Sequence, residues 1–116
     1  MNQLKAIFGN NGRNELSAAE ANTRIGSDEP LFILDVREPQ EYQMGHIEGA
    51  ILIPLGELGR RVKELPTDRE ILCVCASGSR SGMATRQLAS AGYKAINLRG
   101  GMVGWQHARY AITRGK

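Results

Sequence analysis

The sequence predicts an α/β domain built on a largely parallel β-sheet. Short apolar runs typical of buried strands alternate along the chain with stretches compatible with helices, and this alternation favours parallel pairing through helical crossovers. The chain has 116 residues, which is enough for one hydrophobic core and too few for two domains. Hydrophobic residues make up 41% and charged residues 23%, as in an ordinary globular protein.

The predicted domain begins after a polar N-terminal segment. Residues 1–14 end in the turn-forming run Gly-Asn-Asn-Gly-Arg-Asn, so we interpret them as an N-terminal extension or linker and assign residues 15–116 to the domain. The first helix is predicted near Ser17, because Ser17 and Glu20 have the spacing of a capping box.

Four apolar runs are predicted to form strands, and they cover residues 31–36, 50–54, 71–74 and 94–98. The first is almost continuously apolar, as expected of a strand that is buried on both faces of a parallel sheet. The second is short because Pro54 stops it. The third is bounded by charged residues and leads into a cysteine.

Three further helices complete the predicted alternation. Apolar residues at helical spacing indicate an amphipathic helix over residues 55–65, which Pro66 ends. A helix-compatible stretch over residues 81–91 is closed by Gly92. After a pair of glycines, a last helix is predicted from about residue 102 to residue 111.

The run from Cys75 to Ser81 carries the strongest chemical signal in the chain. It reads Cys-Ala-Ser-Gly-Ser-Arg-Ser and joins the end of a predicted strand to the start of a predicted helix. Backbone N–H groups in such a loop, together with a helix N-terminus, favour anion binding. The partial positive charge of these N–H groups also favours a thiolate, and thiols placed this way have pKa values of roughly 3.5–7.5 instead of about 8.5. The sequence therefore predicts a nucleophilic Cys75 inside an anion-binding loop, here called the cradle (residues 75–81).

Composition and charge argue against several other classes of protein. The net charge of +3 is modest and the basic residues are scattered, so we do not expect nucleic-acid binding. No apolar run approaches the roughly 20 residues that cross a bilayer, and the apolar core near the start is too short for a secretory signal. With only two cysteines, we expect a cytoplasmic protein that has free thiols and no membrane partner.

Several separated motifs follow one another in a fixed order. They are Leu-Asp-Val-Arg-Glu (34–38), Glu-Tyr (41–42), Gly-His-Ile-Glu-Gly-Ala (45–50), Ile-Pro (53–54), the cradle, and Leu-Arg-Gly-Gly-Met-Val-Gly-Trp (98–105). In this order and spacing the chain resembles the single-domain rhodanese family of sulfurtransferases. The resemblance extends over about residues 15–108, which is nearly the whole predicted domain.

The resemblance implies a rhodanese fold, in which a five-stranded parallel sheet is flanked by helices on both faces. It also implies a ping-pong reaction. Cys75 would take sulfane sulfur from a small anionic donor such as thiosulfate, hold it as a persulfide, and pass it to cyanide or to a thiol. A protein sulfur donor or acceptor is a further expected partner, and neither a metal nor an organic cofactor is expected.

Substrate contacts are expected from the rest of the cradle. Its backbone N–H groups are suited to stabilise both a thiolate and a persulfide anion. The forked guanidinium of Arg80 is suited to pair with a sulfonate-like oxygen of the donor. Gly78 lets the loop curl inward, and the serines offer hydroxyl donors. The predicted substrate-binding residues are Ala76, Ser77, Gly78, Ser79, Arg80 and Ser81.

Other notable residues are expected to have supporting roles. Asp35 and Arg37 lie where a strand ends, and the resemblance places them beneath the cradle, where they would fix its shape. His46 is interpreted as a structural histidine in a turn rather than a proton shuttle. Trp105 is expected to anchor the last helix in the core. Cys73 is interpreted as a small core residue. The alternative is that Cys73 resolves a persulfide formed on Cys75.

Two alternatives to a sulfurtransferase stay open at this point. One is a persulfide carrier or binding module that depends on a protein partner. The other is a cysteine-based phosphatase or an arsenate reductase. Such phosphatases have a longer run between cysteine and arginine than the four residues that separate Cys75 from Arg80. The shorter loop makes a smaller cradle, which favours attack on sulfur.

Overall fold

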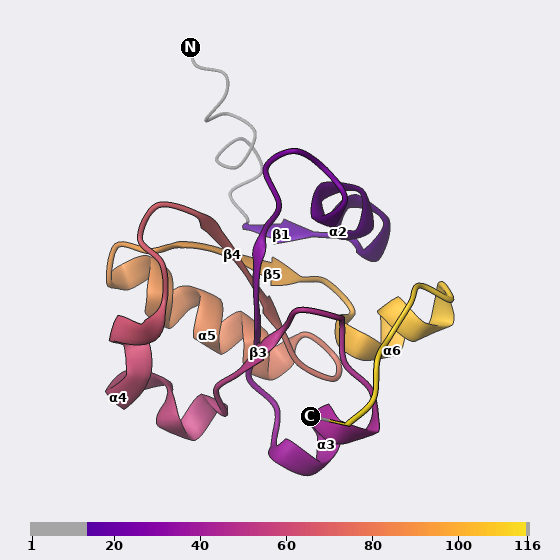
Figure 1. Cartoon of the computed structure of the whole chain (residues 1–116). Coiled ribbons are helices and arrows are strands. Elements are labelled where there is room, and N and C mark those ends of the chain that lie inside the picture. The colour runs from indigo at the N-terminus through magenta and orange to yellow at the C-terminus, as the bar shows by residue number, and fades with distance from the viewer. Residues whose placement is uncertain (1–13, 116) are drawn as a thin grey trace.

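The computed structural model describes residues 14–115 and contains one five-stranded sheet (Figure 1). The strand order is β1-β5-β4-β2-β3, and every neighbouring pair is parallel. The strands are β1 (Glu15–Leu16), β2 (Phe32–Asp35), β3 (Ile51–Leu52), β4 (Glu70–Val74) and β5 (Lys94–Leu98). The predicted α/β class with a five-stranded parallel sheet is confirmed.

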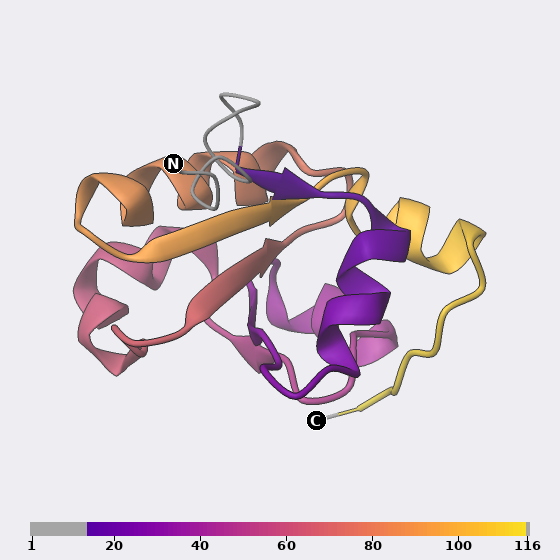
Figure 2. The same cartoon turned by 90° about the horizontal axis from the view of Figure 1, so that it is seen from above.

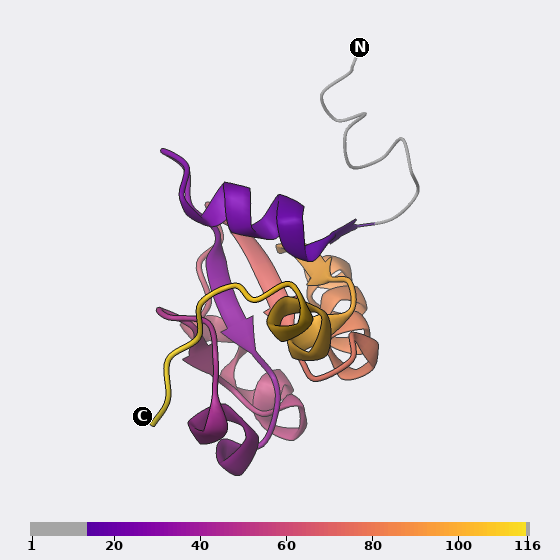
Figure 3. The same ribbon diagram turned by 90° about the vertical axis from the view of Figure 1, so that its right-hand side faces the viewer.

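Helices cover both faces of this sheet (Figures 2 and 3). Helices α2 and α6 contribute to the hydrophobic core on one face, and α4 and α5 contribute to the core on the other. The α-helices are α2 (Ala18–Ile25), α3 (Pro39–Met44), α4 (Leu58–Arg61), α5 (Ser79–Ser90) and α6 (Gly101–His107). Within residues 14–115, none of the helices has both the length and the apolar composition required to cross a bilayer.

The central strand shows why the sheet has two cores. Successive residues of a strand point to opposite faces. Leu72 and Val74 of β4 pack in the same core as Trp105 of α6. Ile71 and Cys73 of β4 belong to the core on the opposite face. Burial on both faces explains why this strand is a nearly continuous apolar run in the sequence.

The start of the domain agrees with the predicted capping box. The Ser17 hydroxyl accepts a hydrogen bond from the backbone N–H of Glu20 (3.1 Å), and the Glu20 carboxylate accepts one from the N–H of Ser17 (2.8 Å). The predicted extension lies outside the described residues apart from Asn14. The Asn14 carbonyl accepts a hydrogen bond from the N–H of Asn97 (2.7 Å), which ties this residue to β5.

The prediction of one continuous helix over residues 55–65 is wrong. The segment consists of a 3-10 turn η1 (Leu55–Glu57), the short α4, and a second 3-10 turn η2 (Val62–Glu64). Gly56 and Gly59 lie in this segment, and glycine lowers helix propensity by about 1 kcal/mol relative to alanine.

Two predicted helix boundaries also need correction. Helix α5 begins at Ser79, two residues before the predicted start, directly after Gly78 in a left-handed conformation (φ 104°). Helix α6 ends at His107 instead of residue 111. Arg109 adopts a left-handed φ of 66°, and the chain turns back so that the indole N–H of Trp105 donates to the carbonyl of Ala111 (2.9 Å).

Two elements were not predicted from the residues, namely β1 and α3. β1 has only two residues and is recognised by its pairing with β5, which a local pattern does not reveal. Helix α3 did have a sequence signal. Glu38 and Glu41 form a capping box, and Pro39 occupies the first helical turn, where proline is favoured.

Candidate active site

Cys75 lies directly after β4 at the carboxyl edge of the sheet. Because β4 has β5 on one side and β2 on the other, this position is near the middle of that edge. The cradle then leads into α5, whose first residue is Ser79 (Figure 1). The carboxyl edge is where parallel α/β sheets bind ligands, so the fold places the predicted nucleophile where a site is expected.

The Cys75 sulfur is surrounded by hydrogen-bond donors of its own loop. The backbone N–H of Gly78 donates to Sγ (3.1 Å), and the Ser81 hydroxyl lies 3.3 Å from Sγ. Burial raises the pKa of the thiol, but hydrogen bonds from the Ser81 hydroxyl and from the backbone at Ser81, Gly78 and Ser77 outweigh burial and lower the pKa below its ordinary value. The site therefore stabilises an anionic sulfur.

The carbonyl groups of the cradle are held by neighbouring elements. The N–H groups of Met102 and Val103, in the first turn of α6, donate to the carbonyls of Cys75 (2.8 Å) and Ala76 (3.0 Å). These bonds fix the peptide groups so that the N–H groups that follow remain available to an anion. Helix α6 therefore acts as a support for the cradle.

Asn97 of β5 supports the cradle from the neighbouring strand. Its amide Nδ2 donates to the Gly78 carbonyl (3.2 Å), and its Oδ1 accepts from the Ser81 hydroxyl (2.6 Å). This hydroxyl also lies 3.3 Å from Cys75 Sγ, and because it has a single proton, it donates to the sulfur only when that proton turns away from Asn97. Sequence reasoning missed Asn97, because only the pairing of β4 with β5 brings this amide next to the loop.

The predicted supporting residues form a buried ion pair. The Asp35 carboxylate is completely buried. Its two oxygens share the single Nε–H of Arg37 (2.9 and 3.2 Å), and Oδ2 also accepts from a terminal guanidinium nitrogen (2.8 Å). That nitrogen also donates to the carbonyl of Gly45 (2.8 Å). These bonds connect the end of β2 to the end of α3. They support the cradle through α3, and the Asp35 carboxylate also contributes to raising the pKa of Arg80 in the cradle.

Helix α3 contacts the cradle through one residue that sequence reasoning missed. Both carboxylate oxygens of Glu41 accept from the Arg80 guanidinium, at 2.8 and 2.9 Å. The hydrogen bonds from Arg80 lower the pKa of Glu41 to about 2 despite its partial burial, and the same pairing raises the pKa of Arg80. Arg80, which was predicted to contact the donor, is thus paired with a carboxylate in this structure.

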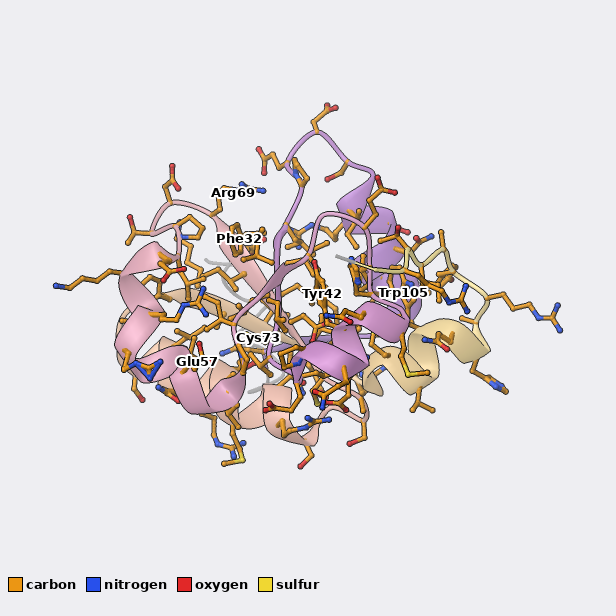
Figure 4. All side chains as sticks on the ribbon, turned by 60° about the horizontal axis from the view of Figure 1, so that its bottom comes forward. Phe32, Tyr42, Glu57, Arg69, Cys73 and Trp105 are labelled. Atoms are coloured by element: carbon orange, nitrogen blue, oxygen red, sulfur yellow. The ribbon has the colours of Figure 1, made fainter. Side chains whose placement is uncertain are left out.

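Cys73 lies in the interior of the domain (Figure 4). Both cysteines are free thiols, and Cys73 is fully buried in the core that also contains Leu88 and Ala84. Burial raises the pKa of the Cys73 thiol to about 12, so this sulfur stays protonated at neutral pH. The interpretation of Cys73 as a core residue is confirmed.

His46 and Trp105, the other two residues noted in the sequence, are both buried. His46 is buried and stacks on the ring of Tyr42 (centroids 3.6 Å apart), and its Nδ1 lies 2.7 Å from the Tyr42 carbonyl. Trp105 is buried against α2 and the sheet, as predicted. Within residues 14–115, no three side chains of histidine, cysteine, aspartate or glutamate are grouped so that they would hold a metal ion.

Comparison with known proteins identifies the family. The family model described as "Rhodanese-like domain" matches residues 17–108, and the chain therefore belongs to the rhodanese-like family. A crystal structure of "Thiosulfate sulfurtransferase from Pseudomonas aeruginosa" is similar with a TM-score of 0.82 and 31% identity. That similarity covers 97% of this chain and 22% of the other, so the shared part is one domain of a longer protein.

Two curated relatives show how this domain is used elsewhere. "Sulfurtransferase" of Allochromatium vinosum is 34% identical over 100 residues, which are 85% of this chain and 92% of that protein. "Putative sulfur carrier protein YrkF" of Bacillus subtilis is 46% identical over 92 residues, which are 78% of this chain. The chain spans 50% of the length of the Bacillus protein. Both names refer to sulfur transfer or sulfur carriage by those proteins.

The rate of Cys75 alkylation is expected to rise with pH, with a midpoint below about 8.5, which is the pKa of a free thiol. The hydrogen bonds to Sγ favour the thiolate, so the reactive form is present at lower pH than in a free cysteine. The rate of iodoacetamide reaction, followed from about pH 5 to about pH 10 in Cys73→Ala, measures this midpoint. In Ser81→Ala we expect a higher midpoint. A midpoint at or above about 8.5 in Cys73→Ala contradicts the expectation.

Proposed function

We propose that this chain is a sulfurtransferase in which Cys75 carries sulfane sulfur as a persulfide. The observation that carries the proposal is the environment of Sγ, where a backbone N–H and a hydroxyl surround a thiol with a lowered pKa. Such donors stabilise the attacking thiolate and also a persulfide, which is an anion near neutral pH. Membership of the rhodanese-like family and the sulfur-related names of the relatives support the same chemistry.

In the first half-reaction, the Cys75 thiolate attacks the sulfane sulfur of a donor such as thiosulfate. A new S–S bond forms on Cys75, and the S–S bond of the donor breaks with its electron pair leaving on sulfite. The charge is conserved, because a thiolate and a dianion give a persulfide anion and a dianion. The cradle N–H groups bind the anion at each stage.

In the second half-reaction, an acceptor nucleophile attacks the terminal sulfur of the persulfide. Cyanide leaves as thiocyanate, a thiolate leaves as a persulfide, and the Cys75 thiolate is regenerated. Cys75 is completely buried in this structure, so surrounding side chains must move aside before a donor or an acceptor reaches Sγ. No step as written requires a metal or an organic cofactor.

A persulfide carrier that depends on a protein partner is the second candidate. The observation that favours it is the Bacillus relative, whose name describes a sulfur carrier and which is twice as long as the matched segment. A carrier uses the same Cys75 persulfide but turns over poorly with small molecules. Its sulfur would come from, or go to, a cysteine of another protein.

A matrix of donors and acceptors distinguishes the two candidates. We expect the protein to turn over with at least one pair drawn from thiosulfate or glutathione persulfide as donor and cyanide or a thiol as acceptor. We expect Cys75→Ser to abolish turnover with every pair, because a hydroxyl replaces the thiolate. Cys73→Ala is the matched control and should retain activity, because Cys73 lies in the core with a protonated thiol.

The outcomes separate cleanly. Turnover that persists in Cys75→Ser would refute the assignment of the nucleophile. Stable loading of one sulfur on wild-type protein, with no turnover for any small acceptor, would favour the carrier. A folded wild-type protein that loads no sulfur from any small donor would overturn the first candidate, and one that also takes none from a protein persulfide would overturn the carrier as well.

A further inference from the structure

The charge at the cradle is balanced by a residue from another helix. Arg80 is the one basic residue of the cradle sequence, and its two terminal nitrogens donate to the two carboxylate oxygens of Glu41. This fork-to-fork arrangement is the strongest geometry for such a pair. Glu41 lies on α3, so the pair connects this helix to the first turn of α5.

Glu41 is held in place from a second side. Its Oε1 also accepts the backbone N–H of Glu38 (2.9 Å) in the capping box of α3. The end of the same helix is fixed by Arg37, which donates to the carbonyl of Gly45 (2.8 Å). The carboxylate is therefore positioned by the fold as well as by Arg80. Its pKa of about 2 keeps it ionised throughout the neutral range.

This pairing changes what the cradle offers to a donor. A free Arg80 guanidinium would bind a sulfonate group through two parallel hydrogen bonds. With Glu41 in place, Arg80 and Glu41 together carry no net charge. A dianionic donor must therefore either displace the Glu41 carboxylate from Arg80 or bind beside this negative charge. A donor with a singly charged or uncharged leaving group is repelled less by the Glu41 carboxylate.

We propose that Glu41 is a specificity-determining residue that engages Arg80 and thereby disfavours doubly charged donors such as thiosulfate relative to donors whose leaving group carries one charge or none. This inference rests on the proposed transfer of sulfur to Cys75. Alkyl persulfides fit the preferred class. The Cys75 thiolate attacks the terminal sulfur of R–S–SH, the donor S–S bond breaks, and the thiolate that leaves takes up the proton.

The experiment compares two sulfonyl donors that differ by one charge. Thiosulfate leaves as sulfite, a dianion, and methanethiosulfonate leaves as methanesulfinate, a monoanion. In Glu41→Gln, we expect the ratio of kcat/KM for thiosulfate to kcat/KM for methanethiosulfonate to rise about tenfold. Glutamine also serves in a capping box, so α3 should remain intact.

Two further variants identify the cause of that rise. Glu29→Gln removes the same charge from the loop before β2, at the opposite edge of the sheet, where salt screens it from the cradle. We expect no change in the ratio for this control. In the double variant Glu41→Gln with Arg80→Gln, we expect the rise to disappear, because no guanidinium is left to bind the sulfonate.

An unchanged ratio in Glu41→Gln overturns the inference, as does an equal rise in Glu29→Gln or a rise that persists in the double variant.

A binding measurement keeps the test independent of sulfur transfer. Sulfate and methanesulfonate are compared for protection of Cys75 from iodoacetamide, and Glu41→Gln should strengthen protection by sulfate selectively. If no donor transfers sulfur, the proposed function fails, while this protection ratio still supports or refutes the role of Glu41.

Discussion

Gly101→Ala is expected to destabilise the protein and to reduce activity by about 100-fold or more. A Cβ atom at this position would lie 2.5 Å from the carbonyl oxygens of both Cys75 and Ala76, which are backbone atoms that cannot swing away. Gly101 also has a left-handed φ of 57°, which costs other residues about 1–2 kcal/mol. Relief of the clash must displace the cradle from α6, and a shift of about 1 Å at a reacting group can cost about 100-fold in rate.

Gly100→Ala is the matched control for backbone strain. Gly100 also has a positive φ, 84°, but the nearest atom to its added Cβ is the Gly104 Cα at 3.8 Å, an ordinary contact. Urea denaturation and steady-state turnover compare the two variants. We expect a modest loss of stability in Gly100→Ala with activity largely retained. Equal effects of the two substitutions on activity would contradict the account of α6 as the support of the cradle.

Arg37→Ala is expected to lower the free energy of unfolding by about 3–5 kcal/mol, because it leaves the Asp35 carboxylate buried without its charged partner, and only the backbone N–H of residue 37 still donates to it. It also removes the hydrogen bond to the Gly45 carbonyl, which holds the end of α3. Because α3 carries Glu41, the pairing with Arg80 should loosen as well. Chemical denaturation of wild type and variant, with the donor ratio measured on the folded fraction, tests both effects.

Two comparisons separate this expectation from a general loss of surface charge. Arg61 forms ion pairs with Glu57 and Glu64 on the surface of α4, so Arg61→Ala should have little effect on stability. The double variant Asp35→Ala with Arg37→Ala should lose less stability than the sum of the single variants, because neither charge is left alone. Additive losses would show that the two residues do not act as a pair.

The sequence was sufficient to predict those parts of the fold and site that depend on local pattern. The three longer strands, β2, β4 and β5, are largely apolar because most of their residues are buried, and that pattern can be read directly from the sequence. The cradle is equally local. Its nucleophile, its left-handed Gly78 and the start of α5 lie within a few residues of one another.

Features that depend on contacts between distant segments were missed. Glu41 is 39 positions from Arg80 in the sequence, and Asn97 is 19 positions from Gly78. Nothing in the local surroundings of either residue reveals its partner. The same holds for β1, whose two residues are defined by pairing with β5. The order of the strands, which brings β5 and β2 to either side of β4, creates these contacts.

Helix boundaries failed for a different reason. Between residues 55 and 65, the apolar spacing correctly indicated a face that is buried against the sheet, and Leu58 and Leu65 do pack there. The spacing does not report whether the backbone is α-helical or 3-10, since both keep neighbouring turns on one face. At the end of α6, the turn at Arg109 is fixed by the hydrogen bond from Trp105 to Ala111, which is a tertiary feature.

Intact-protein mass spectrometry after exposure to a sulfane donor detects the proposed Cys75 persulfide as an added sulfur atom. We expect wild-type protein and Cys73→Ala each to gain one sulfur atom that cyanide removes, and we expect Cys75→Ser to gain none. Methanethiosulfonate and an alkyl persulfide belong in the experiment beside thiosulfate, because Glu41 is proposed to disfavour the dianion. A wild-type protein that gains no sulfur from any of the three, or a Cys75→Ser protein that still does, would contradict the account.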